Sequence, residues 1–318
     1  MSIERADRER HDRLVEIAWL HHEYGLTQEV ISRRYGVSRS TISRALRDAQ
    51  EQGIVHVTLT EPMPEEWRLS EQLSAALGIR AHVGTSPSGD AEIPGRQVAG
   101  RVAARIVERI AEPGHLTIAA TWGRTLSAAA HAVRPRRTQG VVVVDAVGHT
   151  SGGHIAPALD VTRTLAAALG ASAVHLASPA FANPASREFL ASSQPVKRTL
   201  GLAQAADVTL TSVGVVGPDS LLVLEGFLDT AAMGRLAKAG AAGEILGQYY
   251  DASGDLVPNP SLLTVGLTLD DLRAAKRVIA VAAGERKAEA VAGAVAGRLV
   301  SEVVVDDHLA RALMGRPG

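Results

Sequence analysis

Apolar residues in the first fifty positions recur at the three- and four-residue spacing of amphipathic helices. They form three groups: Leu14, Ile17, Ala18 and Trp19; Val30 and Ile31; and Ile42, Ala45, Leu46 and Ala49. The pattern predicts three short helices whose apolar sides meet in a small core.

The residues between these groups carry the start and stop signals of helices. Thr27 and Ser38 are suited to N-cap helices that begin at the next residue. Gly36 lets the chain take a positive φ in the turn, and we expect Val37 to fill the angle between the two helices. This spacing is typical of a helix-turn-helix. The apolar run 54–59 (IVHVTL) then predicts a short closing strand, or wing.

Charge is unevenly distributed along this region. The formal net charge of the chain is -1, yet residues 30–47 contain five arginines and no acid. A basic face suits the phosphates of DNA, and the second helix of such a motif meets base edges in the major groove. We therefore predict double-stranded operator DNA as a partner, contacted by Thr27, Gln28, Ser38, Arg39, Ser40, Thr41, Ser43, Arg44 and Arg47. The alternative is a surface helical hairpin with solvated arginines.

A domain boundary follows at residues 61–66. The sequence EPMPEE holds two prolines, which neither continue a helix nor donate to a central strand. We place a linker there, between a DNA-binding domain of residues 1–60 and a second domain of residues 67–318. Residues 67–77 return to helical spacing, and this segment is either a connecting helix that packs against a partner or the first helix of the second core.

The rest of the chain alternates compact apolar runs with longer alanine-rich helical stretches. The runs are 116–120, 141–148, 173–179, 207–217, 278–284 and 302–307, and the helices between them include 100–110, 125–132, 159–169, 236–246 and 285–299. Such alternation predicts an α/β fold with a parallel sheet covered by helices on both faces.

Ligands of parallel sheets bind outside the carboxyl ends of the strands. Several loops that follow the predicted strands contain glycine, and two of them place Arg124 or Lys287 at the start of a helix. A helix N-terminus offers free N–H groups and a positive dipole end, so an anion such as phosphate is favoured there. Asp251 is either an acceptor for ligand hydroxyls or simply a turn residue.

Composition narrows the remaining classes. With 318 residues, 46% hydrophobic and 21% charged, the chain can form two globular domains. Because it has no cysteine and no long apolar run, we expect a cytoplasmic protein without disulfides, thiolate chemistry or a membrane partner. The chain lacks a nucleophile elbow, a Walker loop and a His-Glu-x-x-His pair. His149 and His154 lie near Asp145 without a convincing third ligand, so we expect no metal and no cofactor.

Several motifs in order give the chain a family resemblance. The helix-turn-helix followed by TWGRTL, GAAGEILGQYYDASGDLV, VAAGERKAEAV and VVVDDHLARALM resembles the SorC family of sugar-binding regulators, relatives of DeoR-type repressors. The resemblance implies a homotetramer whose second domain is similar to the fold of ribose-5-phosphate isomerase and glucosamine-6-phosphate deaminase. It implies that a sugar phosphate, sugar or polyol controls operator affinity from a pocket formed by Thr121, Trp122, Gly123, Arg124, Thr125, Gly152, Gly153, Asp251, Gly284, Glu285 and Lys287.

The sequence departs from the family pattern at two positions. Glu244 stands where the family usually has its acid in a GAVGD-like motif, and Ala283 replaces the first glycine of a usual pair. The second change adds a methyl group where backbone approaches the ligand. An enzyme of the isomerase or deaminase type with an appended DNA-binding head is the alternative function, in which Lys287 would form a Schiff base instead of pairing with phosphate.

Overall fold

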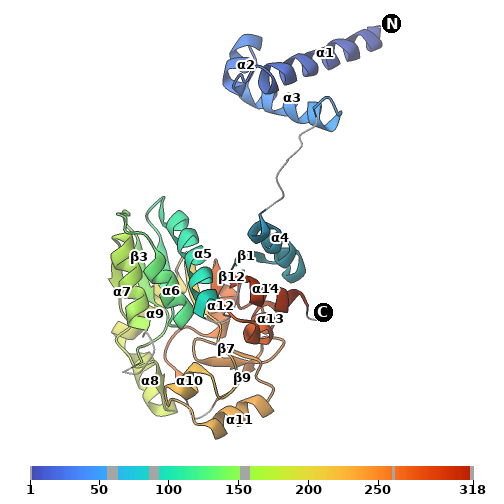
Figure 1. Ribbon diagram of the computed structural model, residues 1–318. Coiled ribbons are helices and arrows are strands. Elements are labelled where there is room, and N and C mark those ends of the chain that lie inside the picture. Colours follow the sequence, from blue (N-terminus) through green and yellow to red (C-terminus); the bar gives the residue numbers. More distant parts are fainter. Residues whose placement is uncertain (1, 56–63, 86–92, 151–157, 260–261, 316–318) are drawn as a thin grey trace. The chain divides into compact units, whose positions relative to one another are not determined.

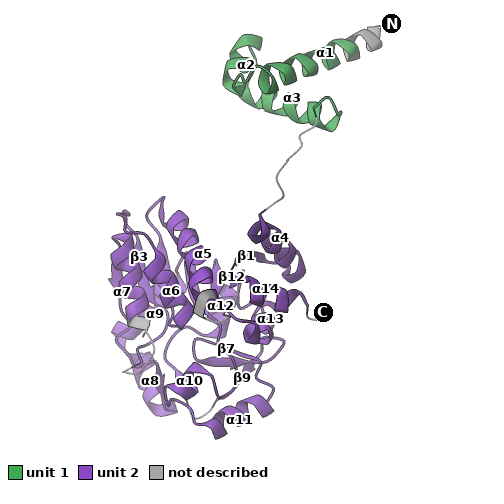
Figure 2. Ribbon diagram, viewed as in Figure 1, with its two compact units in different colours: residues 1–62 green, residues 63–318 purple. Residues whose placement is uncertain are grey.

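The computed structural model describes residues 2–55, 64–85, 93–150, 158–259 and 262–315. The chain forms two compact units, Met1–Pro62 and Met63–Gly318, which we call the head and the sheet unit (Figure 2). No helix among the described residues is long and apolar enough to cross a membrane.

The head contains three helices, α1 (Ser2–His22), α2 (Gln28–Tyr35) and α3 (Arg39–Glu51) (Figure 1). Its core joins Ile17, Leu20, Ile31, Ile42 and Leu46. The three predicted helices are confirmed, although α1 is much longer than expected.

Three apolar side chains of the head are exposed against expectation. Trp19 is 55% exposed because Ile17 and Leu20 already occupy the side of α1 that faces the core. Val30 is exposed as well, because its neighbour Ile31 occupies the core position. Val37 is also exposed, so it does not fill the angle between the helices. Residues 54 and 55 are not in a strand, and residues 56–59 of the expected wing lie outside the described residues.

The caps of α2 and α3 form as predicted. The Thr27 hydroxyl accepts a hydrogen bond from the Val30 N–H at 3.3 Å, and the Ser38 hydroxyl accepts one from the Thr41 N–H at 3.1 Å. Gly36 has a φ of 62°, the left-handed conformation that ends α2 and is cheap for glycine. Local side chains therefore set the angle of the turn.

The sheet unit is built on seven parallel strands in the order β1-β12-β11-β6-β2-β3-β4. The strands are β1 (Arg80–Gly84), β2 (Thr117–Ala120), β3 (Val142–Asp145), β4 (Ser172–Val174), β6 (Val208–Ser212), β11 (Val278–Val281) and β12 (Glu302–Asp306). All six predicted strands pair in this sheet, and of its seven strands only β1 was not predicted. The parallel α/β architecture is confirmed.

Helices cover both faces of the sheet (Figure 1). One core lies under α5 (Ile93–Ala111), α6 (Arg124–Ala132) and α7 (Ala158–Leu169). The other lies under α4 (Glu65–Leu77), α9 (Gln194–Gln204), α12 (Leu269–Ala274), α13 (Ala288–Ala296) and α14 (Asp307–Met314). Because both faces are covered, the strands are apolar along their length.

Smaller elements surround the carboxyl ends of the strands. β5 (Phe181–Ala182) pairs with β10 (Leu263–Thr264), and β7 (Gly243–Ile245), β8 (Gln248–Tyr250) and β9 (Leu256–Val257) form an antiparallel sheet. Short helices complete this part: α8 (Pro184–Ser192), α10 (Leu221–Leu224), α11 (Thr230–Lys238) and the 3-10 turn η1 (Glu285–Lys287). The predicted helix over 236–246 is wrong, because α11 ends at Lys238 and the chain then enters β7, which pairs with β8.

The segment predicted as either connecting helix or core helix belongs to the second core. Leu69 and Leu73 of α4 are buried in the sheet unit. The hydroxyls of Ser70 and Ser74 accept hydrogen bonds at 2.9 Å from the N–H groups of Val83 and Ala81 in β1. α4 thus satisfies the free edge of β1, which would otherwise invite pairing with another strand.

Candidate DNA-binding surface and ligand cavity

The first half of α3 presents a polar, basic surface. Ser38, Arg39, Ser40 and Thr41 are exposed, as are Arg44 and Arg47, whereas Ser43 is half-buried. Their neighbours Ile42, Leu46 and Ala49 are buried and anchor the helix to the core. Thr27 is exposed and Gln28 half-buried at the start of α2.

Most arginines of this surface form no ion pair within the described part of the head. Among the described residues, Arg39, Arg44 and Arg47 make no salt bridge or side-chain hydrogen bond, whereas Arg33 pairs with Glu29 one turn away. Ser38 lies 2.7 Å from the Ser40 hydroxyl and 2.8 Å from that of Thr41, so these three side chains form one hydrogen-bonded group. The arrangement leaves planar guanidinium groups available to phosphates and guanine edges.

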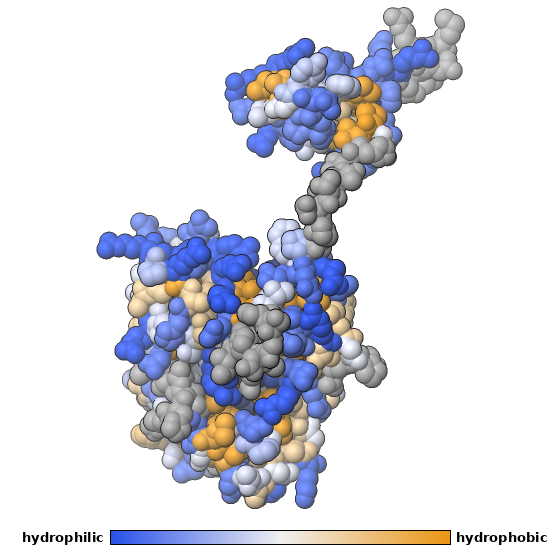
Figure 3. Space-filling view, viewed as in Figure 1, coloured by the Kyte–Doolittle hydropathy of each residue, from blue (hydrophilic) through white to orange (hydrophobic). Residues whose placement is uncertain are grey.

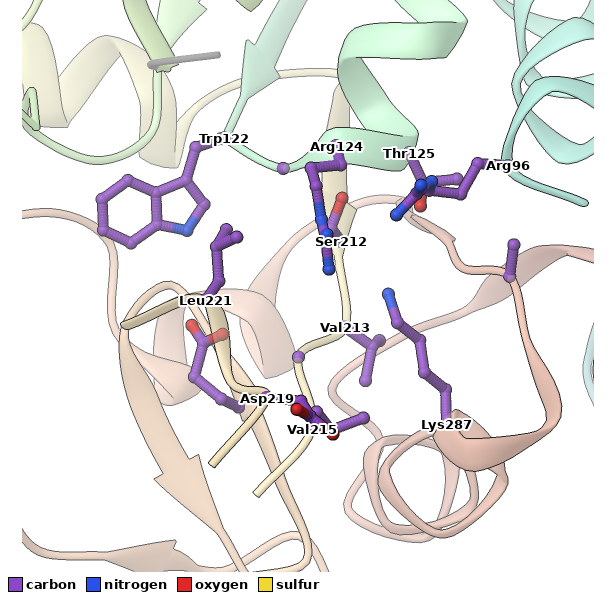
Figure 4. Close-up of a pocket in the computed structure, with 14 residues that line it drawn as sticks. Arg96, Trp122, Arg124, Thr125, Ser212, Val213, Val215, Asp219, Leu221 and Lys287 are labelled. Atoms are coloured by element: carbon purple, nitrogen blue, oxygen red, sulfur yellow. The ribbon is translucent and has the colours of Figure 1, made fainter. Parts of the chain in front are cut away.

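The sheet unit has a cavity at the carboxyl ends of β2, β6 and β11 (Figure 4). It measures about 570 Å³, counting the solvent at its mouth. Its polar walls come from segments far apart in the sequence: Arg96, Trp122, Arg124, Thr125, Ser212, Asp219, Glu244 and Lys287. This is the sheet edge at which ligands of parallel α/β proteins bind.

Three cations line the cavity. Arg96 comes from the first turns of α5, Arg124 is the first residue of α6, and Lys287 ends η1. Figure 4 shows the side chains of Arg124 and Lys287 extending into the same space from opposite walls, with Arg96 beside Thr125. The first N–H groups of α6 have no partner within their own helix, so they add donors at this point.

Gly123 makes the approach of α6 to β6 feasible. Its φ of 135° and ψ of 146° lie where only glycine is unstrained, and a Cβ atom there would overlap the hydroxyl of Ser212. The Ser212 hydroxyl is buried and has no hydrogen-bond partner among the described residues. The cavity floor therefore combines bare backbone with an unsatisfied hydroxyl.

Glu244 supplies a buried carboxyl group on the wall. It is 6% exposed, one of its oxygens accepts a hydrogen bond from the Gly247 N–H, and the other faces Gly214 so closely that a Cβ atom would not fit. Burial raises the pKa of Glu244 to about 7, although the Gly247 N–H and Lys287 act in the opposite direction. A carboxyl group of this kind can accept a hydroxyl hydrogen bond when ionised.

Asp306 holds the loop that carries Lys287. One of its oxygens accepts hydrogen bonds from the Gly284 N–H at 3.0 Å and the Leu309 N–H at 3.4 Å. Burial raises the pKa of this carboxyl group. Asp219, on the opposite wall, pairs with Arg286 at 2.7 Å. Carboxylates thus hold both loops in place, the one that carries Lys287 and the one that carries Asp219.

The structure brings together five of the predicted ligand residues: Trp122, Gly123, Arg124, Thr125 and Lys287 line the cavity. Thr121 lies buried just behind them and donates to the Trp122 carbonyl at 3.1 Å. Gly284 and Glu285 are in the adjoining loop but not on the wall.

Asp251 is not brought to the cavity. Its carboxylate accepts hydrogen bonds from the Ser253 and Asp255 N–H groups, which makes it the turn residue of the β8–β9 hairpin. That turn lies against Gly293 and Gly297, toward the far end of α13 from Lys287. Gly152 and Gly153 lie outside the described residues.

Arg96, Ser212 and Asp219 were missed by sequence reasoning, and Glu244 was noted only as a departure from the family. No sequence pattern pointed to Arg96 as a cavity residue, because it lies in an ordinary amphipathic helix upstream of all the other cavity residues. Ser212 and Gly214 lie in a run predicted as strand, whose carboxyl end points to the cavity. Their place at the carboxyl end of a predicted strand was the sequence feature that could have identified them as cavity residues.

A second polar group lies at the end of β3. The buried Asp145 carboxylate accepts a hydrogen bond from the Leu176 N–H at 3.0 Å and lies 3.1 Å from Nδ1 of His175 and 3.8 Å from Nε2 of His149. In the described part of the chain, no three such side chains are arranged to hold a metal ion. His154 lies outside the described residues.

The sequence of the chain matches known proteins over almost its entire length. Residues 61–315 match a family of sugar-binding domains, and residues 8–57 match a family of homeodomain-like domains. The chain is 32% identical over 307 residues to the sorbitol operon regulator of Klebsiella pneumoniae, which covers 95% of this chain and 97% of that protein. It is 28% identical to the deoxyribonucleoside regulator of Bacillus subtilis, with 97% and 99% covered.

The crystal structure of the full-length sorbitol operon regulator SorC from Klebsiella pneumoniae superposes on this chain with a TM-score of 0.71, covering 95% of this chain and 98% of that one. Fold, surface and matches define a class: a transcriptional regulator that joins a helix-turn-helix to a sugar-binding domain. The chain belongs to the SorC family of these regulators. It is a DNA-binding regulator of carbohydrate catabolism.

Proposed function

We propose that the cavity of the sheet unit binds a small phosphorylated sugar or polyol, and that this ligand controls the affinity of the head for operator DNA. The observation that carries the proposal is the convergence of Arg96, Arg124 and Lys287 on a cavity whose other wall holds Glu244. Cations and a helix N-terminus favour a phosphate group, and a carboxylate favours hydroxyl groups. The ligand class follows from these two requirements.

The coupling between the two sites is thermodynamic linkage. A ligand that binds better when the heads are arranged for DNA, or when they are not, changes operator affinity by the same factor by which DNA changes ligand affinity. One head contacts little DNA, so we propose that a symmetric oligomer, the tetramer expected of the family, reads a near-palindromic operator. The contacts are those of Thr27, Gln28 and the exposed side of α3.

Thermal shift with a panel of sugar phosphates, their unphosphorylated sugars and polyols tests the ligand class. We expect a phosphorylated compound to raise the melting temperature and Lys287→Met to abolish that rise. Lys238→Met is the matched control, because Lys238 is exposed on α11 and does not line the cavity. Equal shifts in the two variants, or a response to unphosphorylated sugars alone, would overturn the phosphate assignment.

Operator retardation in a gel, with and without the compound found, tests the coupling. The apparent affinity for DNA should change about 5- to 150-fold, the usual range for coupled sites. No change at saturating ligand would show that the cavity does not control the head.

The relatives are named as regulators, and we propose that the cavity binds its ligand without turnover. The competing enzymatic function has one observation in its favour: a carboxyl group with a pKa of about 7 near Lys287 is the kind of group that acts as a general base. Product formation from ribose and glucosamine phosphates by purified protein, lost in Glu244→Gln, would establish that alternative.

A further inference from the structure

The amino ends of the seven parallel strands lie at the edge of the sheet opposite the cavity. The segments that lead into the strands, each taken from the last turn of the preceding helix to the first strand residue, are all described. They contain nine basic and five acidic side chains, although the formal net charge of the chain is -1. The basic ones are Arg80, Arg109, Arg134, Arg136, Arg137, Arg273, Lys276, Arg277 and Arg298, and the acidic ones are Glu108, Glu112, Asp207, Asp271 and Glu302. This edge therefore carries an excess of positive charge.

Four of these five acids are engaged by groups within the protein. Three form ion pairs of 2.6 to 2.7 Å at this edge, in the pairs Glu108–Arg136, Asp207–Lys276 and Glu302–Arg277. Asp271 accepts hydrogen bonds from Thr268 in the capping box of α12. Glu112 is exposed and makes no ion pair among the described residues. One acid thus remains to balance the basic side chains that have no partner.

Four arginines at this edge are exposed and make no ion pair or side-chain hydrogen bond among the described residues. They are Arg109, Arg134, Arg137 and Arg298. The end of α5 and the segment 134–137 are joined through Glu108, which precedes Arg109. Its carboxylate pairs with Arg136 and accepts a hydrogen bond from the Arg134 N–H at 2.8 Å. Three of the four arginines are therefore held in neighbouring segments.

An open hollow adds two more arginines to this group. Arg109 lines it together with Arg80 and Arg277, and the hollow measures about 680 Å³, counting the solvent at its mouth. Arg80 lies 3.5 Å from Glu302 and keeps 65% of its side chain exposed. Figure 3 shows hydrophilic side chains gathered along the upper edge of the sheet unit, where α5 ends. We call six arginines the basic edge: Arg80, Arg109, Arg134, Arg136, Arg137 and Arg277.

The chemistry of the basic edge fits a polyanion better than a protein surface. None of the large exposed apolar side chains in the described residues belongs to it, and the isoleucines of the hollow, Ile106 and Ile110, are buried or half-buried. Protein–protein interfaces are centred on aromatic and apolar side chains, whereas interfaces with DNA are more polar and much more basic.

The arrangement of the basic edge also favours an extended partner. Its arginines come from four separate segments of the chain and surround an open hollow instead of an enclosed pocket. A guanidinium group binds two phosphate oxygens at once, so arginines spread in this way suit successive phosphates of a nucleic-acid backbone. Duplex DNA is the polyanion that this regulator already binds through its head.

We propose that the basic edge is a second DNA-contacting surface, which binds backbone phosphates of duplex DNA beyond the operator. Contacts to phosphates hold a protein on the duplex without reading its sequence, and they make the affinity depend on salt. This surface goes beyond the proposed roles of α3 and of the cavity. It gives the sheet unit a direct part in DNA binding.

The first test measures binding of the full chain to a duplex of random sequence by fluorescence anisotropy over a series of salt concentrations. The combined variant Arg109→Ala, Arg134→Ala and Arg137→Ala should bind more weakly at low salt. Its slope of log affinity against log salt should be about 3 smaller in magnitude, because each phosphate contact contributes about 0.9. The three side chains make no ion pair within the described residues, so the variant should keep its melting transition.

A matched control removes the same charge elsewhere on the sheet unit. The combined variant Arg198→Ala, Arg235→Ala and Lys238→Ala changes exposed side chains of α9 and α11 that make no ion pair among the described residues. Its salt slope should equal that of the wild type. An unchanged slope in the basic-edge variant, or an equal decrease in the control, would overturn the proposal. An acidic protein surface or a small phosphate compound would then be the remaining partners.

The second test uses the absence of native cysteine. Gln139→Cys places a thiol at an exposed position two residues after Arg137, and Ala237→Cys places one on the exposed side of α11. Each protein is labelled with a cysteine-specific photo-crosslinker and irradiated with the random-sequence duplex. The first should give a covalent protein–DNA adduct at a higher yield than the second. Equal yields would show that the basic edge does not lie on DNA.

A duplex no longer than the operator separates this proposal from the assignment of α3. The basic-edge variant should bind this short duplex as tightly as the wild type, whereas Arg39→Ala with Arg44→Ala should lose binding to it. A loss in the basic-edge variant would contradict a contact beyond the operator. Failure of the basic edge in any of these tests would leave the proposed roles of α3 and of the cavity unaffected.

Discussion

The exposed side of α3 in the head and the cavity of the sheet unit both carry basic side chains, yet they hold them in opposite ways. On α3, Arg39, Arg44 and Arg47 are exposed and make no ion pair among the described residues. In the cavity, Arg124 and Lys287 share walls with the buried carboxyl group of Glu244. One surface offers positive charge to a polyanion, whereas the other places both signs around a small space.

The difference predicts how each site responds to its surroundings. Exposed arginines that replace condensed counterions give affinities that fall steeply with salt. Charges in a partly enclosed cavity are screened less, so their behaviour depends on burial and protonation. Salt should therefore weaken DNA binding strongly and ligand binding little.

The largest expected effect is a loss of operator binding when arginines of α3 are removed, which distinguishes the head from the sheet unit. Arg39→Ala combined with Arg44→Ala should weaken operator binding by about 4 kcal/mol, roughly a thousandfold, because we propose that each arginine contacts a base or a phosphate. Gel retardation at fixed salt measures it. Arg101→Ala with Arg105→Ala removes the same charge from the exposed side of α5 and should change little. Equal retardation of both double variants would contradict the assignment of α3.

The next largest expected effect is a pH dependence of stability that comes from the protonation of Glu244. The pKa of Glu244 is about 7 in the folded protein against an ordinary value of 4.5, so the folded state holds this proton more tightly. Stability contributed by the protonated group is present below about pH 4.5 and lost as the pH rises through 7, a difference of about 3 kcal/mol. Glu244→Gln removes this dependence.

Chemical denaturation of wild type and Glu244→Gln at pH 5 and pH 8 measures the effect. The free energy of unfolding of the wild type should fall between the two pH values by about 2.5 kcal/mol more than that of the variant, because pH 5 already lies slightly above the ordinary pKa of the group. Parallel changes in both proteins would show that Glu244 is not the group responsible.

Backbone strain at the cavity is expected to be smaller. Gly123→Ala should destabilise the fold by about 2 kcal/mol, because φ at this position is 135° and the new Cβ atom would overlap Ser212. Gly201→Ala is the matched control, since Gly201 lies inside α9 with no atom within 4 Å of the added Cβ. Melting temperatures that fall equally, or not at all, would argue against this strain.

The smallest expected effect is the loss of helix stability when the N-cap of α3 is removed. Ser38→Ala removes the N-cap of α3 and should cost about 1 kcal/mol. Hydrogen exchange of the α3 amides in the full chain should become roughly fivefold faster. Gln50→Ala, at an exposed position of the same helix, is the control. Unchanged exchange in Ser38→Ala would mean that packing alone holds the helix start.

The success of sequence reasoning differed between the two regions for a physical reason. The helices, caps and turn of the head are decided by residues three to five positions apart, so Thr27, Gly36 and Ser38 could be assigned directly. Alternation of apolar runs and helices was equally direct for the parallel sheet. The error at 236–246 arose because β7 exists only through its pairing with β8, which a helical period does not reveal.

The cavity at the carboxyl ends of β2, β6 and β11 depends on residues that local patterns predict only in part. Arg124 and Lys287 stand at helix starts after predicted strands, so local pattern and family resemblance both pointed to them. Arg96 and Glu244 reach the same space from elements more than a hundred residues apart. Asp251 had the same local signal as a ligand residue, but its own turn uses the carboxylate.

The amino-acid sequence by itself determined which segments are helices and strands in the head and in most of the sheet, which face of α3 is basic, and which family the chain resembles. These properties depend on short-range periodicity and capping. Only the tertiary structure decided which cations meet in one cavity, how far Glu244 is buried, and which apolar side chains stay exposed. Those properties depend on how strands distant along the chain are ordered in the sheet, and no local pattern encodes that order.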